Sequence, residues 1–304
     1  MRTVNQTLVR GGAALLRAYF RHVPFTIGKR PVWNSIAQRL MARGHDLDLQ
    51  ATTTFGARMH VRFPDSIQSF VYFLGVWEPS ITAYLVQAIA PGDIVIDIGA
   101  NVGYDTLLAS HLVGEAGQVH AIEASPTVYA LLTANLALNR TTNVTPHHAA
   151  VCASDCMVPI FLHDRCNLGG TTIVPSVARR RAATLEATIP GRPLGDILPM
   201  ATIIGARLIK IDVEGAEWPV VQGFADLLPR LSSRTELLIE VSAEALHDHD
   251  TSIPQFLDLF RRAGFSPYAL GNRYTIDMYL EPATPPERLT GEDFDQLDIL
   301  FRRE

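Results

Sequence analysis

Cysteine is scarce in this sequence. The 304 residues include three cysteines, Cys152, Cys156 and Cys166. A small, odd number in a long chain is not the disulfide framework of small secreted domains, so we expect a reducing compartment. Together with His163 these cysteines resemble a metal cluster, but their Cys-x3-Cys-x6-His-x2-Cys spacing lacks the Cys-x2-Cys pairs of structural zinc sites. We therefore expect no zinc centre here.

Long hydrophobic runs and an excess of positive charge are also missing. The chain is 47% hydrophobic and 19% charged, with a formal net charge of −5. This composition is typical of a soluble globular protein. Arginines interrupt the apolar patch at residues 11–16 before it reaches signal-peptide length, so we expect a cytoplasmic protein. The acidic balance argues against a nucleic-acid partner, because such binding needs a basic surface.

Acidic residues are absent from the first 45 positions, which contain eight Lys and Arg. The apolar spacing there predicts two helices, one through Leu8, Leu15 and Tyr19 and one from Pro31 to Gly44. Two interpretations stay open. The apolar stripe packs against the rest of the protein and leaves a solvated basic face, or the segment contacts an anionic substrate or a membrane surface.

The sequence divides into three regions. Residues 1–45 form the basic helical extension. Within 46–90, the alternation in residues 47–63 predicts a small β-hairpin, and residues 80–90 predict a helix that leads into the main domain. Residues 91–304 form that main domain, which the hairpin and the helix flank.

From residue 91 onward, short apolar runs alternate with helix-length segments. Strands are predicted at 94–96, 119–122, near 144, at 208–211 and 237–241, with a closing pair at 267–270 and 274–280, and helices after Gly103, at 126–138 and at 253–263. Such alternation builds a parallel sheet, so we expect a doubly wound α/β fold. Residues 174–193 show no clear period and are predicted to be a long exposed insertion.

The turn after the first predicted strand has a ligand-binding pattern. Gly99 and Gly103 allow tight turning where open α/β sheets bind ligands. Asn101 replaces the glycine that lets a pyrophosphate approach, and Asp97 favours a ligand with a positive group over a phosphate. Glu123, 26 residues after Asp97, ends the second strand where a carboxylate binds ribose hydroxyls.

Three segments resemble the FkbM family of S-adenosylmethionine-dependent methyltransferases, over residues 70–280. They are Asp-x-Gly-Ala-Asn-x-Gly-Tyr from Asp97, Glu-Ala-Ser-Pro from Glu123 and Ile-Lys-Ile-Asp-Val-Glu-Gly-Ala-Glu from Ile209, with weaker matches at 75–79 and 167–170. The resemblance implies a Rossmann-like, mostly parallel seven-stranded sheet and S-adenosylmethionine as cofactor. The cofactor site that it implies consists of Glu78, Asp97, Gly99, Asn101, Gly103, Tyr104, Glu123 and Ala124.

Carboxylates gather after the strand that ends at Ile211. Asp212 and Glu214 follow this strand directly, and Glu240 ends the neighbouring strand, so we expect all three at one edge of the sheet. We predict these three as the catalytic residues. The sequence leaves open whether they raise one another's pKa and supply a base, share a Mg²⁺ ion, or only anchor the loop.

The resemblance implies that the chain methylates a hydroxyl of a sugar, glycolipid, polyketide or other secondary metabolite. Two other classes are kept as alternatives: a nicotinamide-dependent oxidoreductase on a similar sheet, and a noncatalytic adenosyl-binding protein. Asn101 and the intact Gly99 turn count against them. We expect a small-molecule, glycan-linked or lipid-linked acceptor as partner, with peripheral membrane contact through residues 1–45 as a further hypothesis. The sequence does not indicate an oligomeric state.

Overall fold

The structure, a computed structural model, describes residues 6–23, 26–42, 47–163, 167–272 and 274–304. Its centre is an eight-stranded sheet in the order β12-β11-β13-β10-β9-β3-β4-β5. The strands are β3 (Ile94–Ile98), β4 (Gln118–Glu123), β5 (Val144–His148), β9 (Leu208–Ile211), β10 (Glu236–Ser242), β11 (Ser266–Leu270), β12 (Glu287–Arg288) and β13 (Gln296–Arg302).

Five neighbouring strands of this sheet, from β5 to β10, run parallel. Strand β13 is antiparallel to both β10 and β11. The doubly wound, mostly parallel fold is confirmed, with the two-residue β12 as an eighth strand at the edge. The chain runs from β3 outward to β5 and then returns to β9 on the other side of β3, so the switch point where such sheets bind ligands lies between β3 and β9.

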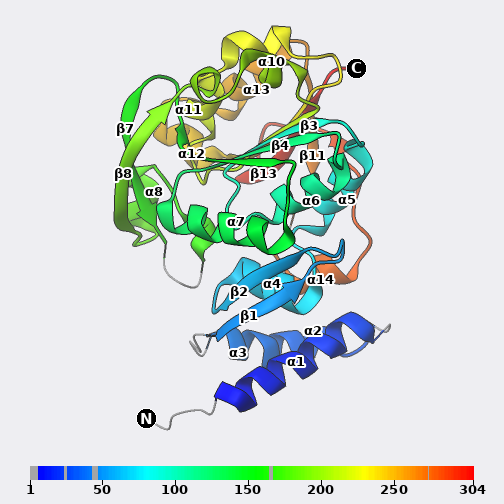
Figure 1. Ribbon diagram of the computed structural model, residues 1–304. Helices are drawn as coiled ribbons and strands as arrows, with labels where there is room; N and C mark the ends of the chain where they lie inside the picture. Colours follow the sequence, from blue (N-terminus) through cyan, green and yellow to red (C-terminus); the bar gives the residue numbers. More distant parts are fainter. Residues whose placement is uncertain (1–5, 24–25, 43–46, 164–166, 273) are drawn as a thin grey trace.

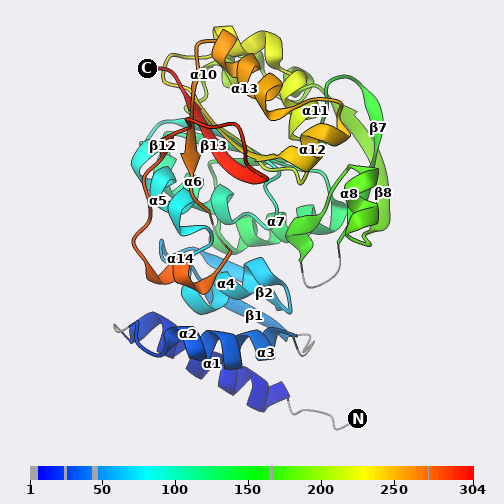
Figure 2. The ribbon, with the colours of Figure 1, turned by 180° about the vertical axis from the view of Figure 1, so that it is seen from behind.

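Helices cover both faces of the sheet (Figures 1 and 2). On one face lie α5 (Pro79–Ala88), α6 (Tyr104–Val113) and α7 (Pro126–Asn139), and on the other α10 (Met200–Gly205), α11 (Glu217–Gln222), α12 (Ala243–Asp248) and α13 (Ile253–Arg262). The short α9 (Leu194–Ile197) and a 3₁₀ turn at Ala225–Arg230 pack in the same core as this second group of helices. Phe256 and Phe260 of α13 are fully buried against β10 and β13, which makes this face the larger core.

The N-terminal region lies below the sheet in Figure 1, with the hairpin between the helices and the main domain. Helix α1 (Gln6–His22) is followed by α2 (Lys29–Val32), a π-helical turn (Trp33–Ala37) and α3 (Gln38–Ala42). The predicted hairpin is present as β1 (Leu47–Thr52) and β2 (Arg58–Phe63). The predicted end of the second helix, Gly44, lies outside the described residues. Across the described residues, no helix combines the length and the apolar character needed to cross a membrane.

Helix α4 (Ser66–Leu74) was not predicted. Asp65 caps its first turn by accepting a hydrogen bond from the backbone N–H of Gln68, and Gly75 ends it in the left-handed conformation. Residues 68–73 are all buried, so the segment has no polar face to reveal a helical period.

Residues 174–193, predicted to be a long exposed insertion, are in large part exposed but form regular secondary structure. Here α8 (Pro175–Arg180) precedes β8 (Thr184–Arg192), which pairs with β6 (Ala150–Val151) and β7 (Cys156–Leu162) in a separate three-stranded sheet beside the main one. Many β8 side chains are exposed whether they are apolar or polar, which hides the strand period. Cys152 and Cys156 of this region are free thiols, and Cys166 lies outside the described residues.

The closing pair is also corrected. Residues 276–280 form helix α14 (Ile276–Leu280), and β11 pairs with β13, which lies further along the chain.

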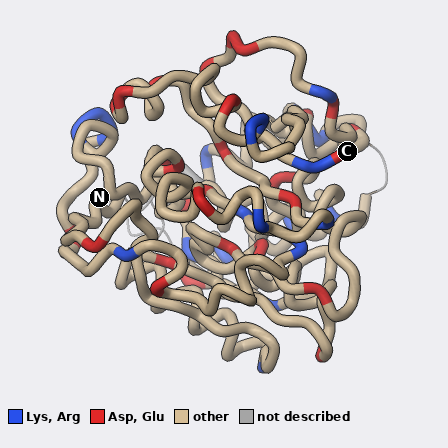
Figure 3. Tube along the Cα trace, turned by 90° about the horizontal axis from the view of Figure 1, so that it is seen from above, with Lys and Arg blue, Asp and Glu red and all other residues tan. Residues whose placement is uncertain are grey.

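Seen from above, acidic and basic residues are interspersed along the described trace (Figure 3).

Candidate active site

A cleft of about 1030 Å³, including its open mouth, lies at the carboxyl ends of β3, β4 and β9. Its inner wall is the turn between β3 and α6. Gly99 has φ 84°, and a Cβ atom there would lie 1.8 Å from the carbonyl oxygen of Asp212. Glycine is therefore required because the Gly99 turn and the loop after β9 approach each other closely, which brings two predicted motifs together.

Asn101 occupies the left-handed region with φ 50°, which asparagine tolerates better than most residues. Its side-chain oxygen accepts from the backbone N–H of Val102, and its own N–H donates to Glu123 Oε2 at 3.0 Å. The residue that replaces the expected glycine thus keeps the backbone conformation that the turn needs. Gly103 (φ 89°) packs against Leu132 and does not line the cleft.

Glu123 lies at the end of β4 with its carboxylate at the rim of the cleft. It accepts from the backbone N–H groups of Ser125 at 2.8 Å and Asn101 at 3.0 Å, and it is 8% exposed. Burial raises its pKa to about 7, although these backbone donors oppose the rise. Each carboxylate oxygen retains a lone pair for a hydroxyl donor, as the ribose prediction requires. Ala124 lines the cleft beside it.

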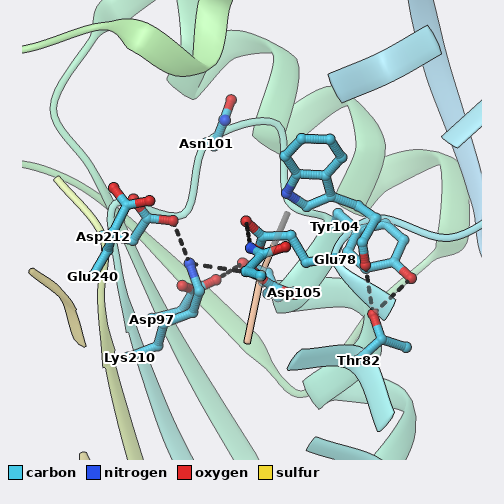
Figure 4. Close-up of polar contacts among 12 residues, drawn as sticks. Glu78, Thr82, Asp97, Asn101, Tyr104, Asp105, Lys210, Asp212 and Glu240 are labelled. Carbon is cyan, nitrogen blue, oxygen red and sulfur yellow. Dashed lines mark hydrogen bonds and ion pairs between the residues drawn. The ribbon is translucent and has the colours of Figure 1, made fainter. Parts of the chain in front are cut away.

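The floor of the cleft is organised by Lys210, a buried residue of β9 (Figure 4). Its Nζ lies 2.9 Å from Asp212 Oδ2 and 3.3 Å from Asp105 Oδ2. Burial alone would lower the pKa of this ammonium group, but the surrounding carboxylates, Asp212 and Asp105 first, raise it well above its usual value. Lys210 is therefore a permanent positive charge among acids.

Asp97 lies beneath this floor and is not part of the cleft lining. It is 2% exposed and accepts a hydrogen bond from the Thr106 hydroxyl. Burial raises its pKa to about 6, and the charge of Lys210 opposes the rise. Asp97 is therefore one of the carboxylates whose negative charge raises the pKa of Lys210. Direct contact between Asp97 and a cofactor stays a prediction.

Glu78 closes the side of the cleft opposite Glu123. Its Oε1 accepts from Asn272 Nδ2 at 2.8 Å and from the Tyr274 hydroxyl at 3.1 Å. The Tyr274 hydroxyl also lies 3.2 Å from Glu240 Oε1, and the Tyr274 ring stacks on Trp77. Tyr104 lines the cleft more deeply, with its hydroxyl 3.1 Å from that of Thr82.

The three predicted catalytic acids are adjacent. One carboxylate oxygen from each of Asp212, Glu214 and Glu240 lies within 4.8 Å of the others. Burial, followed by the charge of Asp212, raises the pKa of Glu214 to about 7 against the opposing effect of Arg181. Burial and the neighbouring Asp212 also raise the pKa of Glu240 well above its usual value.

Glu217 has a different position from these acids. It is 3% exposed, and its Oε1 accepts from the backbone N–H groups of Val213 and Gly215. This carboxylate therefore anchors the loop that presents Asp212 and Glu214.

Sequence reasoning missed several residues of the site. They are Asp105, Lys210, Asn272, Tyr274 and Asp298. A signal existed for Lys210, because a lysine in a four-residue strand of otherwise aliphatic residues needs a buried partner. Asn272 and Tyr274 come from the loop after β11, about 200 residues from Glu78 in sequence, and no local pattern places them there.

The residues of the cleft fit S-adenosylmethionine. Glu78 Oε2 and Asp105 Oδ1 are buried and have no hydrogen-bond partner within the described chain, and both side chains line the cleft. Unpaired buried acceptors are costly, and a ligand with an ammonium group would supply the missing donors. Acids outnumber the single lysine, which suits a cationic ligand and disfavours a pyrophosphate.

Known proteins that resemble this chain in sequence are methyltransferases. The model of the methyltransferase FkbM domain matches residues 97–267. The 31-O-demethyl-FK506 methyltransferase FkbM of Streptomyces tacrolimicus is 28% identical over an aligned length of 202 residues, and the match covers 58% of this chain and 74% of the relative. These matches are to methyltransferases, not to the oxidoreductase or noncatalytic protein kept as alternatives.

Two solved structures are reported for comparison. The methyltransferase FkbM from Methylobacillus flagellatus KT is 14% identical, with a TM-score of 0.42 and coverage of 89% of this chain and 60% of that one. An S-adenosylmethionine-dependent O-methyltransferase from Thermotoga maritima is 12% identical, with a TM-score of 0.41 and coverage of 84% and 78%. Because the family model spans more than half of the sequence, the chain belongs to the FkbM family of S-adenosylmethionine-dependent methyltransferases.

Proposed function

We propose that this methyltransferase acts on a hydroxyl oxygen of a small molecule, such as a sugar, glycolipid, polyketide or other secondary metabolite. The curated relative is named for an oxygen position of its acceptor, which supports this class. The observation that carries the proposal is the Lys210–Asp212 pair at 2.9 Å. It offers a partly exposed carboxylate, paired with a buried cation, at the acidic edge of the cofactor cleft.

S-adenosylmethionine supplies an electrophilic methyl group on a positively charged sulfur. Glu123 would hold the ribose, and Glu78 and Asp105 would accept from the ammonium group. An acceptor oxygen at the acidic edge would receive the methyl group, with the sulfur as the leaving group. Asp212 takes the hydroxyl proton, and Lys210 keeps this carboxylate oriented. Glu214 and Glu240 complete the acidic edge on which the acceptor hydroxyl lies.

The Asp212→Asn variant tests this assignment. We expect turnover to fall by about 100-fold or more, because a general base contributes about 10²–10⁴-fold. Affinity for S-adenosylhomocysteine should change little, since Asp212 receives the acceptor proton. The measurement is transfer of labelled methyl to a library of hydroxyl compounds, with the exposed Asp226→Asn as matched control. An Asp212→Asn rate equal to that of the control would contradict the proposal.

The same three carboxylates could hold Mg²⁺ as oxygen ligands. We favour the base, because Lys210 and Arg181 already compensate Asp212 and Glu214. Methyl transfer should therefore survive dialysis against EDTA. Loss of activity that added Mg²⁺ restores would replace the base with a metal.

A further inference from the structure

A second cavity of about 600 Å³ opens next to the cofactor cleft. It lies between α8, the loop at Glu214–Glu217, the start of α12 and the first residue of β13. Glu214 and Glu240 line both cavities. Two of the three predicted catalytic acids therefore form the wall between the space for the cofactor and this second space, so a methyl acceptor bound there would lie beside them.

Helix α8 is fixed over this second cavity by ion pairs. Arg180 Nε lies 2.9 Å from Glu244 Oε1, and Arg180 Nη2 lies 2.8 Å from Asp248 Oδ2. Ser176 donates to the same oxygen of Asp248 at 2.7 Å. These contacts join α8 to α12, which lie on the same side of the molecule in Figure 2. The basic segment that shows no period in the sequence thus forms one wall of the cavity.

The lining of the second cavity is almost entirely polar. Arg180, Arg181, Glu214, Glu217, Glu240, Ser242, Glu244 and Gln296 contribute to it, against Val177 and Ala245 as apolar side chains. An apolar acceptor would remove these charges from water without offering hydrogen bonds in return. An anionic acceptor would meet four carboxylates and only two guanidinium groups. A neutral molecule with many hydroxyl groups offers donors to the carboxylates and acceptors to the arginines.

We propose that the second cavity is the acceptor site and that it takes a neutral polyol, namely a sugar ring. The inference rests on the proposed O-methylation and adds to it the acceptor class and the residues that select it. Arg180 and Gln296 contact the sugar away from the reacting hydroxyl. Arg181 is a positioning residue, because its Nη1 lies 2.6 Å from Glu214 Oε2 and holds that carboxylate at the boundary.

The test uses the chain of 304 residues saturated with S-adenosylhomocysteine. Binding of methyl glycosides of neutral hexoses and deoxyhexoses is measured by saturation-transfer NMR, with glucose 1-phosphate and cyclohexanol as anionic and apolar comparators. We expect at least one neutral glycoside to bind better than both comparators. Arg180→Ala should weaken this binding by about tenfold, and Gln296→Ala, which leaves the ion pairs intact, should weaken it less.

The matched control is Arg179→Ala, because Arg179 is an exposed arginine of the same helix that is not part of the lining. It should bind the glycoside as the parent does, and every variant should keep the parent's affinity for S-adenosylhomocysteine. The inference is overturned if no neutral glycoside binds, if a comparator binds better, or if neither Arg180→Ala nor Gln296→Ala differs from the control. A parent that binds S-adenosylhomocysteine and methylates an apolar alcohol would overturn the acceptor class alone, whereas a parent that does not bind the cofactor product would overturn the proposed function.

Discussion

Glu123 connects three parts of the fold at the rim of the cleft. Its carboxylate accepts from the N–H of Asn101 in the Gly99 turn and from the N–H of Ser125 at the start of α7. The strand end, the turn and the helix are thereby fixed together before any ligand binds. A ribose hydroxyl would add a charge-assisted hydrogen bond to an acceptor that is already oriented.

Glu123→Ala should therefore weaken S-adenosylhomocysteine binding by about 1.5–3 kcal/mol, the range for a hydrogen bond to a charged group. Isothermal titration measures the change. The matched control is Glu115→Ala, which removes an exposed glutamate after α6. Equal affinity in the Glu123→Ala and Glu115→Ala variants would remove the ribose assignment.

At this scale the sequence predicts the residues that follow strands and misses those that arrive through tertiary packing. Asp212, Glu214 and Glu240 are predictable because parallel strands end at one edge. Lys210 is hidden within a strand, and Tyr274 is brought to Glu78 by the loop after β11. The sequence predicts a tight turn at Gly99. In the structure this turn also lies against the backbone of Asp212, in the loop after the neighbouring strand.

Among the elements, the first N-terminal helix is present as predicted but buries a different face. Arg10, Arg17 and Arg21 of α1 donate to backbone carbonyls of the hairpin and α4, so these charges are used within the protein. The buried face of α1 consists of Val9, Ala13 and Phe20. Leu8 and Leu15, through which the sequence placed the helix stripe, are 73% and 75% exposed. The segment contains two apolar stripes, and the packing of the helix determines which of the two is buried.

Membrane contact through residues 1–45 stays a prediction, and the exposed Leu8 and Leu15 give it a specific test. We expect the parent to sediment with vesicles that contain anionic phosphatidylglycerol, because exposed leucines can enter the lipid interface. The double variant Leu8→Glu, Leu15→Glu should stay in the supernatant. Leu185→Glu, which alters a leucine 61% exposed on β8, is the control. A parent that does not sediment would contradict the prediction.

For the whole molecule, the dominant feature is the number of buried acids with raised pKa values. Burial raises the pKa of Glu123, Glu217 and Asp298 to about 7 and that of Asp97 to about 6. The folded state therefore holds protons that the unfolded chain releases near pH 4. The stabilising contribution of these groups is complete below about pH 4, and it is lost progressively as the pH rises from there through about 7.

The cofactor-free protein should consequently unfold at a lower temperature at pH 8.0 than at pH 5.5. A difference of about 1–3 kcal/mol in the free energy of unfolding corresponds to a few degrees for a chain of this size. Differential scanning calorimetry measures it. Glu217→Gln removes one titrating group and should reduce the difference, whereas Glu115→Gln should not. A melting temperature that rises from pH 5.5 to 8.0 in the parent would contradict this charge balance.

The fold class can be predicted from the alternation of strands and helices. The three-stranded sheet of β6, β7 and β8 and helix α4 cannot, because their residues are mostly exposed or mostly buried and show no alternation of apolar and polar positions. The cleft between Gly99, Glu123 and Asp212 is expected to bind the adenosyl cofactor. Isothermal titration of the purified chain with S-adenosylmethionine, S-adenosylhomocysteine and NAD measures this binding. We expect both adenosyl ligands to bind and NAD not to bind; binding of NAD, or no binding of any of the three, would show that the cleft is not an adenosyl site.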